Sequence, residues 1–399
     1  MNKSPLAPHS AARWVGCTGS VKLSEQFPAI PTEQQSESAL EGRAFHEVGQ
    51  RILESFKSGV EGELVGRHQM IGELSKNGVL ITDEIYDAAL EYANDVLKFC
   101  NRTGSLRSLH VEQRIDLSSV YDEMYGYCDA WCFSESTGEL VIWDAKYGHR
   151  RVEAFENWQL IAYAKGILEQ LGIDGHAEQH VKISLRVAQP RVYHRDGCVA
   201  VWDVTASDLR GYFNSLVAAA DEAYSDDAKC VVSDQCYYCP ARYACDTFRN
   251  STMGLIDYVG DVSGSSLSGH ELSIQLRILQ RASKQIKALL SSYEEQATAQ
   301  LRQGDTVPGY GIEQGYGRQR WRKDTPIEEI IMMGELLGVD PRKPVDLDTP
   351  KKLIKLGIDE SVISLYSETP STGLKLVEMS NAKLRNIFRN VPSAHTGEK

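Results

Sequence analysis

The chain has 399 residues, of which 42% are hydrophobic and 25% are charged, proportions typical of a soluble globular protein. No run of about 18 apolar residues occurs, and the start of the sequence lacks the apolar core of a signal peptide. We therefore expect a cytoplasmic protein without membrane contacts. The net charge of −12 argues against non-specific coating of nucleic acid, although bound cations can invert the charge of an acidic site.

Helical periodicity dominates the first hundred residues. A short helix is expected over 11–17, and apolar residues recur at spacings of three and four over 36–58 and again over 80–101. His46 lies near an early turn of the first long helix, one residue after the apolar Phe45. A partly exposed helix histidine is the simplest interpretation of His46, and a metal ligand is the alternative.

The period then changes to two, which predicts strands over 109–115, 124–134 and 138–146. Asp129 interrupts the otherwise apolar or aromatic run of the middle strand. A carboxylate inside a buried strand costs several kcal/mol unless it is paired or binds a metal. The sequence thus predicts a buried ion pair or a metal ligand at Asp129, with Glu112 on the neighbouring strand as an outer partner.

The third predicted strand ends in Asp144-Ala145-Lys146, shortly before Gly148. Side chains two positions apart on a strand point to the same side, so Asp144 and Lys146 are expected to share a face. The acid could hold a divalent cation, and the ammonium could steer a water molecule or a developing negative charge. A solvated strand end would explain the same residues without any chemistry.

A helix is predicted over 152–171, with Phe155 on its apolar side and with Gln159 and Tyr163 one turn apart on a shared face. Strands are expected over 181–187 and 198–204, followed by a helix over about 206–224. This order of helices and strands indicates an α/β fold with a mixed sheet.

Four of the nine cysteines lie close together, and three of them form the pattern Cys236-x2-Cys239-x5-Cys245. In a reducing compartment such crowding indicates a metal centre rather than disulfides. The fourth ligand could be Cys230 or the distant Cys17. Four thiolates suit a structural zinc ion and a [4Fe–4S] cluster equally well. The cysteines elsewhere fit as small buried hydrophobic residues, namely Cys100, Cys128, Cys132 and Cys198.

The last part of the sequence has a different texture. Residues 254–269 are rich in Gly, Ser and Asp and are expected to form a linker. Ser268 and Glu271 form a capping-box pattern that opens a long helix to about residue 301, and Gly304 closes it. A hairpin is expected over 308–323. We therefore divide the chain into a domain over 1–250 and a mainly helical accessory region over 251–399.

Five motifs, taken in order, resemble those of the RecB-like branch of the PD-(D/E)XK nucleases. They are His46, Gly126-x2-Asp129, Asp144-x-Lys146, Gln159-x3-Tyr163 and the cysteine arrangement, which resembles the iron–sulfur subset that includes the AddB nuclease domain and the CRISPR adaptation nucleases. Residues 10–17 are similar to the lead-in of that subset, although Thr18 stands where a proline is more usual. The resemblance covers about residues 7–250 and is strongest to phage- and prophage-encoded members, also through Gln189-Pro190-Arg191.

The resemblance implies a restriction-endonuclease-like core, with helices flanking a mixed sheet, and an iron–sulfur clasp. His46, Asp129, Asp144 and the backbone carbonyl of Ala145 would bind Mg²⁺ or Mn²⁺. The resemblance assigns catalytic roles to Asp129, Asp144, Lys146, Gln159 and Tyr163, and it assigns the [4Fe–4S] cluster to Cys17, Cys236, Cys239 and Cys245, leaving Cys230 outside.

The function implied by the resemblance is that of a metal-dependent DNA exonuclease in phage recombination or DNA end processing. Its expected setting is the cytoplasm of an infected or prophage-carrying bacterium, with a single-strand-annealing protein as a partner. An endonuclease or flap nuclease with the same site, and a zinc-containing DNA-binding scaffold with a vestigial site, are the alternatives. The residues expected to contact DNA are basic or aromatic: Arg150, Arg151, Arg191, Arg318, Arg320, Trp321 and Arg322.

Overall fold

A computed structural model describes residues 6–30, 37–58, 66–173, 180–192, 197–260 and 268–312, together with residues 332 and 361. Contacts between residues divide the chain into two units, 1–314 and 315–399. Every element discussed below lies in the first unit. The predicted domain boundary at residue 250 remains a prediction, and Arg318, Arg320, Trp321 and Arg322 of the expected hairpin lie outside the described residues.

The described residues form a five-stranded mixed sheet in the order β1-β2-β3-β4-β5. The strands are β1 (Leu109–Asp116), β2 (Tyr125–Ser134), β3 (Glu139–Ala145), β4 (Lys182–Ala188) and β5 (Val199–Thr205). Only β3 and β4 are parallel among these neighbours, and the other three pairs are antiparallel. The α/β class with a mixed sheet is therefore confirmed.

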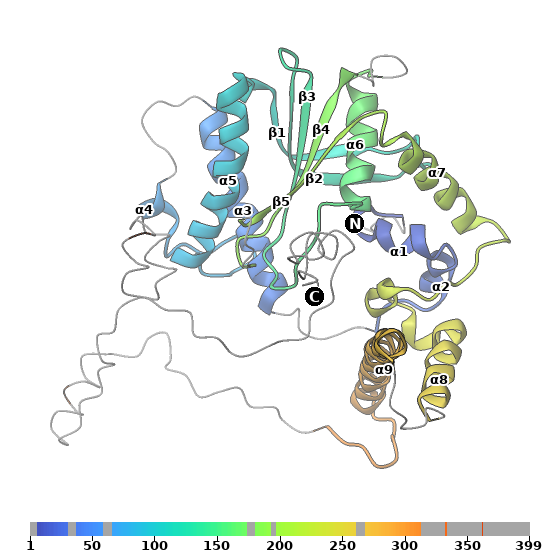
Figure 1. The fold of residues 1–399 in the computed structure, drawn as a ribbon. Helices are drawn as coiled ribbons and strands as arrows, with labels where there is room; N and C mark the ends of the chain where they lie inside the picture. Colours follow the sequence, from blue (N-terminus) through green and yellow to red (C-terminus); the bar gives the residue numbers. More distant parts are fainter. Residues whose placement is uncertain are drawn as a thin grey trace, which may run out of the picture. The chain divides into compact units, whose positions relative to one another are not determined.

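Helices cover both faces of the sheet, as Figure 1 shows. Helices α3 (Glu37–Lys57) and α5 (Asp83–Thr103) pack on one face, where β3 contributes Trp143. Helices α6 (Trp158–Gln170) and α7 (Arg210–Tyr224) pack on the other, where β3 contributes Ile142. Since β3 is covered on both sides, its residues are apolar almost without interruption, as expected for a central strand.

Helix α6 begins later than its periodicity suggested. The Asn157 side chain accepts hydrogen bonds from the backbone N–H groups of Gln159 and Leu160, which makes Asn157 the N-cap. Glu156, just before it, has a left-handed backbone with φ of 53°. The prediction that Phe155 lies on the apolar side of this helix is wrong, because Phe155 precedes the helix and 63% of it is exposed.

The segments before the first long helix are short. They comprise η1 (Pro8–Ser10), α1 (Ala11–Gly16) and α2 (Ser20–Gln26); the short elements α4 (Arg67–Met70) and η2 (Leu106–Ser108) flank α5. After α7 come the two 3₁₀ turns η4 (Asp234–Tyr238) and η5 (Arg242–Ala244). Cys236 lies in η4, and Cys239 and Cys245 directly follow η4 and η5. Chain segments more than two hundred residues apart thus meet, because the Gly19 N–H donates to the Lys229 carbonyl at 3.0 Å.

Helices α8 (Asp246–Gly260) and α9 (Gly269–Gln303) complete the first unit. The linker predicted to start at residue 254 is wrong for residues 254–260, which continue α8. Phe248 and Thr252, four residues apart, are both buried, and Phe248 packs with Leu289 of α9, so tertiary packing sustains the helix. The predicted α9 is confirmed, with the Ser268 hydroxyl accepting from the Glu271 N–H and with Gly304 at φ of 92°. Within the described ranges, no helix is both long enough and apolar enough to cross a membrane.

Candidate functional site

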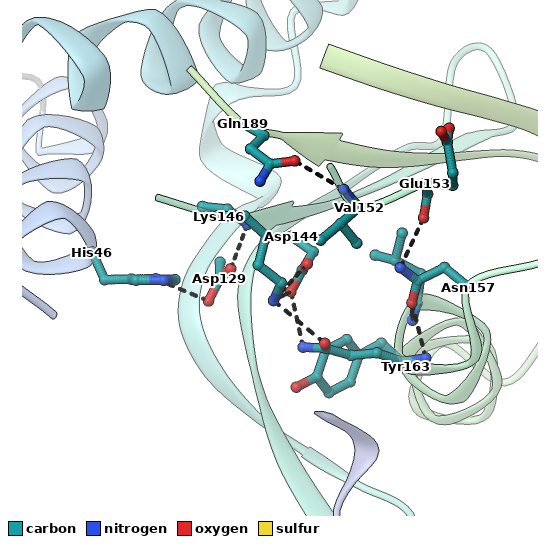
Figure 2. Close-up of polar contacts among 12 residues, drawn as sticks. His46, Asp129, Asp144, Lys146, Val152, Glu153, Asn157, Tyr163 and Gln189 are labelled. Atoms are coloured by element: carbon teal, nitrogen blue, oxygen red, sulfur yellow. Dashed lines mark hydrogen bonds and ion pairs between the residues drawn. The ribbon is translucent and has the colours of Figure 1, made fainter. Parts of the chain in front are cut away.

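Helix α3 and strands β1 and β2 each contribute one side chain to a compact acidic cluster. His46 extends from the middle of α3 toward β2, as Figure 2 shows, rather than from an early turn as expected. Its Nδ1 atom lies 3.3 Å from Asp129 Oδ1 and 3.7 Å from Glu112 Oε1. Ligand atoms of these three residues all lie within 4.8 Å of one another, a spacing that can hold a metal ion.

The backbone of β1 and β2 explains how the two carboxylates meet. Val111 pairs with Ala130 and Gln113 pairs with Cys128, so Glu112 stands opposite Asp129 in the register. Glu112 has a left-handed backbone, with φ of 47°, a conformation that is costly for a residue with a side chain. Glu112 was expected only as an outer partner, and the structure places it in the cluster itself.

A second group forms beside the first, around Asp144 at the end of β3 (Figure 2). Both carboxylate oxygens of Asp144 lie 2.7 Å from Lys146 Nζ, and the Gln159 Nε2 donates to Asp144 Oδ1 at 2.8 Å. Lys146 also reaches Gln159 Oε1 at 3.4 Å. The predicted shared face of Asp144 and Lys146 is thus present, and Gln159 of α6 joins them.

Asp129 connects the two groups. Its Oδ2 accepts a hydrogen bond of 2.6 Å from the Ala145 backbone N–H, between Asp144 and Lys146. The contact of Ala145 with the cluster is therefore made by its amide, whereas the resemblance had assigned a metal-binding role to its carbonyl. Asp144 itself contacts Lys146 and Gln159 and does not belong to the group that includes His46.

The pKa values of these residues reflect burial and opposite charges. Burial alone would lower the pKa of His46, yet Asp129 and Glu112 raise it to about 10. Burial would raise the pKa of Asp129, but His46 and Lys146 lower it below its ordinary value. For Asp144, burial prevails and raises the pKa despite Lys146. The two carboxyl groups therefore differ in their affinity for protons, which is common where acid and base roles are separated.

Tyr163 supports the site from one step away. Its hydroxyl donates to the Tyr127 backbone carbonyl at 2.6 Å, so it fixes β2 next to Asp129. Gly126 makes this approach possible, because a Cβ atom there would lie 2.7 Å from the Tyr163 ring. The Gly-x-x-Asp pattern thus has a steric reason, and Tyr163 touches the backbone of β2 rather than a carboxylate.

The donor set suits a divalent cation. An imidazole nitrogen and carboxylate oxygens are ligands of Mn²⁺ and Mg²⁺ sites, and three of them converge here. The neighbouring Asp144 carboxylate is compensated by the Lys146 ammonium, which lies 2.7 Å from its Oδ2.

Five cysteines line a second cavity, near η4 and η5: Cys17, Cys230, Cys236, Cys239 and Cys245. Backbone N–H groups donate to three of the sulfurs, from Val231 to Cys17 at 3.2 Å, from Ser233 to Cys236 at 3.4 Å and from Phe248 to Cys245 at 3.5 Å. Cys230, left outside the set implied by the resemblance, lies here too. Burial, together with Cys245 and Cys17, raises the pKa of its thiol to about 12.

The spacing of these sulfurs bears on the choice of metal. A tetrahedral zinc ion at about 2.3 Å from each thiolate places the sulfurs about 3.8 Å apart. In the part of the chain that the structure describes, His46, Glu112 and Asp129 make the one group with three ligand atoms within 4.8 Å, so no three cysteine sulfurs meet that limit. The five thiols supply enough ligands for one metal centre, and thiolates are ligands of both zinc ions and iron–sulfur clusters.

The basic residues expected to bind DNA fall into different surroundings. Arg150 and Arg151 line an open cleft that also contains Lys146 and Gln159. Arg191 instead pairs with Glu41 of α3 at 2.6 Å and Glu84 of α5 at 3.0 Å, and its guanidinium lies 3.7 Å from the centre of the Tyr147 ring. These contacts tie three elements together. DNA binding by Arg191 remains a prediction.

The family model described as "Protein of unknown function (DUF2800)" matches residues 3–342. The chain belongs to this family. Among solved structures, one titled "Crystal structure of SSO0001" is 12% identical to this DUF2800 protein and covers 58% of this chain and 94% of its own. Its TM-score is 0.23, so the likeness carries no argument about the fold.

Proposed function

We propose that this DUF2800 protein is a divalent-metal-dependent deoxyribonuclease of the RecB-like PD-(D/E)XK type, acting from DNA ends as an exonuclease. The observation that carries the proposal is the convergence of two groups from four elements. His46, Glu112 and Asp129 form a cation-sized set of ligands, and the buried Asp144–Lys146 pair lies beside it. Metal-assisted phosphodiester hydrolysis needs this combination of hard oxygen ligands and a positioned ammonium.

A bound Mg²⁺ or Mn²⁺ ion would polarise the scissile phosphate and lower the pKa of the attacking water. The side chains of this chain supply the rest. Lys146 holds a positive charge next to the space between the carboxylates, where it can stabilise negative charge that develops on the phosphate. Gln159 orients Lys146 and Asp144 through its amide, and Tyr163 fixes the strand that carries Asp129.

The cysteine cavity supports a [4Fe–4S] cluster as the second cofactor. Cys17, Cys236, Cys239 and Cys245 would hold it, as the resemblance implies, and the backbone N–H groups at three of them would stabilise negative sulfurs. Such a cluster would join residue 17 to residues 236–245 and stabilise the folded unit. A zinc ion held by the same thiolates is the alternative.

The first experiment is a nuclease assay with linear and circular DNA in Mg²⁺ or Mn²⁺. We expect degradation of linear substrates, abolished by EDTA and lowered by orders of magnitude in Asp129→Ala and Lys146→Ala. Asp257→Ala removes an exposed carboxylate on α8 and should behave as the parent. Cleavage of circular single strands would identify an endonuclease instead, and equal activity in all variants would refute the proposed site.

The cofactor is tested by anaerobic purification with measurement of iron, sulfide and zinc. We expect a brown protein that contains iron, and an iron-poor or insoluble product from Cys17→Ala and Cys236→Ala. Cys198→Ser, outside the cavity, should retain iron. A Cys17→Ala protein with full iron content and normal melting would remove Cys17 from the ligand set.

A further inference from the structure

The cleft next to the acidic site has a volume of about 730 Å³. Lys146 and Gln159 line it, and so do Tyr238 and Pro240, which flank Cys239 in the sequence. Its sides are formed by η1 and α1 and by residues 150–158. The cleft is therefore lined both by Lys146 and Gln159, which contact Asp144, and by residues of the segment that carries the cysteines.

Exposed aromatic rings gather along this cleft. Phe155 and Tyr238 line it with 63% and 51% of their surfaces exposed, and Tyr237 packs edge-on against Tyr238 at 5.0 Å between ring centres. The Arg150 guanidinium lies 5.1 Å from the centre of the Tyr238 ring, and its Nη1 donates to the Tyr238 hydroxyl. Large exposed rings that gather in a cleft usually mark a surface that binds a partner.

The charge of the cleft is opposite to that of the whole chain. Among its described lining residues, Arg13, Lys146, Arg150 and Arg151 outnumber the carboxylates Glu153 and Glu156. Glu153 pairs with Arg151, and Glu156 accepts a hydrogen bond of 2.7 Å from the Tyr212 hydroxyl, so the four cations still exceed the two carboxylates. In a protein with a net charge of −12, a cleft with an excess of cations selects for an anionic ligand.

The cysteine segment positions one side of this cleft. Tyr237 and Tyr238 occupy the two positions between Cys236 and Cys239, so the backbone that presents these rings is held at both ends by cysteines of the cavity. Arg13 and Gln235 line both the cavity and the cleft. The cavity and the cleft therefore share part of their lining.

We propose that this cleft binds single-stranded DNA, with bases stacked on Phe155 and Tyr238 and with phosphates paired to Arg150 and Arg151. The inference rests on the proposed function and specifies the form in which the substrate strand reaches Lys146. Aromatic rings beside guanidinium groups bind unpaired bases, whose flat faces are free, whereas the base faces of a duplex are stacked on one another. The cysteine segment then acts as the support of the stacking surface.

The test measures the dissociation constant of fluorescein-labelled oligo(dT) by anisotropy in EDTA, where no hydrolysis occurs. Tyr238→Ala and Phe155→Ala should each raise this constant roughly five- to 150-fold, the range found when a stacking ring is removed. Tyr238→Phe keeps the ring and should bind within about threefold of the parent. Tyr310→Ala, which removes a tyrosine that is 75% exposed and outside the cleft, is the matched control and should leave binding unchanged.

Two results would overturn the inference. One is unchanged oligo(dT) binding in both alanine variants whose circular dichroism matches the parent. The other is binding of blunt duplex DNA or of poly(glutamate) as tight as that of oligo(dT), since the cleft would then select only for negative charge. A parent that binds oligo(dT) through these rings but degrades no DNA in Mn²⁺ would refute the proposed nuclease and leave the strand-binding cleft standing.

Discussion

Replacing Lys146 by methionine tests how the site balances its buried charge. Asp144 is 2% exposed in its side chain, and Lys146 provides the cation 2.7 Å from it. Removing one partner of a buried ion pair typically costs 3–5 kcal/mol, because the other charge stays behind. About a third of the Lys146 side chain is exposed, and the Gln159 amide still donates to Asp144, so we expect a loss of about 2–4 kcal/mol.

The assay is equilibrium urea unfolding followed by circular dichroism, in EDTA so that no cation replaces the ammonium. Burial already raises the pKa of Asp144 against the effect of Lys146, and losing Lys146 should raise it further. The stability lost in Lys146→Met should therefore return as the pH falls through that raised pKa, because a neutral carboxyl needs no partner. The double variant Asp144→Asn/Lys146→Met should recover most of the loss at neutral pH.

Arg249→Met is the matched control. It removes an exposed ion pair with Asp246 on α8 and should cost only a few tenths of a kcal/mol, about 0.3–0.5. A Lys146→Met protein as stable as the control variant at neutral pH would refute the reasoning. So would a double variant as unstable as Lys146→Met, because the loss would then not arise from an unpaired carboxylate.

Three further predictions concern the surroundings of the acidic site. Gly126→Ala should lose roughly 1–3 kcal/mol of unfolding free energy, because its Cβ would lie 2.7 Å from two neighbouring side chains. The control Gly211→Ala meets no atom within 4 Å and should be neutral or stabilising in the same urea unfolding assay. In EDTA, the ion pair of protonated His46 with Asp129 should contribute its full stability below about pH 6.5 and lose it as the pH rises toward about 10. The urea midpoint of the parent should therefore fall over that pH range, and the midpoint of His46→Asn should not. Glu112→Gln should weaken Mn²⁺ binding about tenfold or more in calorimetric titrations. The control Glu123→Gln changes an exposed residue that also has a left-handed backbone, and it should bind Mn²⁺ as the parent does. Equal Mn²⁺ affinities of Glu112→Gln and the parent would exclude Glu112 as a ligand.

Periodicity was sufficient to predict much of the sheet and of the acidic site. The period of two predicted β2 and β3, and the same rule placed Asp144 and Lys146 on one face. The spacing of four along α6 predicted that Gln159 and Tyr163 lie on one side, where Gln159 contacts Asp144 and Tyr163 contacts the backbone of β2. These spacings lie within single strands and helices, so they can be predicted from the sequence alone.

What sequence missed depends on contacts between distant segments or on a single cap. Glu112 became part of the cluster because the pairing of β1 with β2 sets it opposite Asp129, and a strand pattern does not reveal its partner's register. The start of α6 was set by the Asn157 side chain rather than by the apolar pattern. Cys230 is near Cys17 only because the chain folds back after α7, so spacing left it undecided.

The contact between residues 17–19 and residues 229–231 has a consequence for synthesis on the ribosome. Thr18 and Gly19 form hydrogen bonds with Lys229, and Cys17 forms one with Val231. During synthesis, these hydrogen bonds can form only after some two hundred more residues have been translated. The sheet and its covering helices can assemble in the meantime, because their residues emerge first. A chain interrupted before residue 229 would lack these hydrogen bonds, and packing against α6 and α7 would have to hold the α1–α2 segment in place without them.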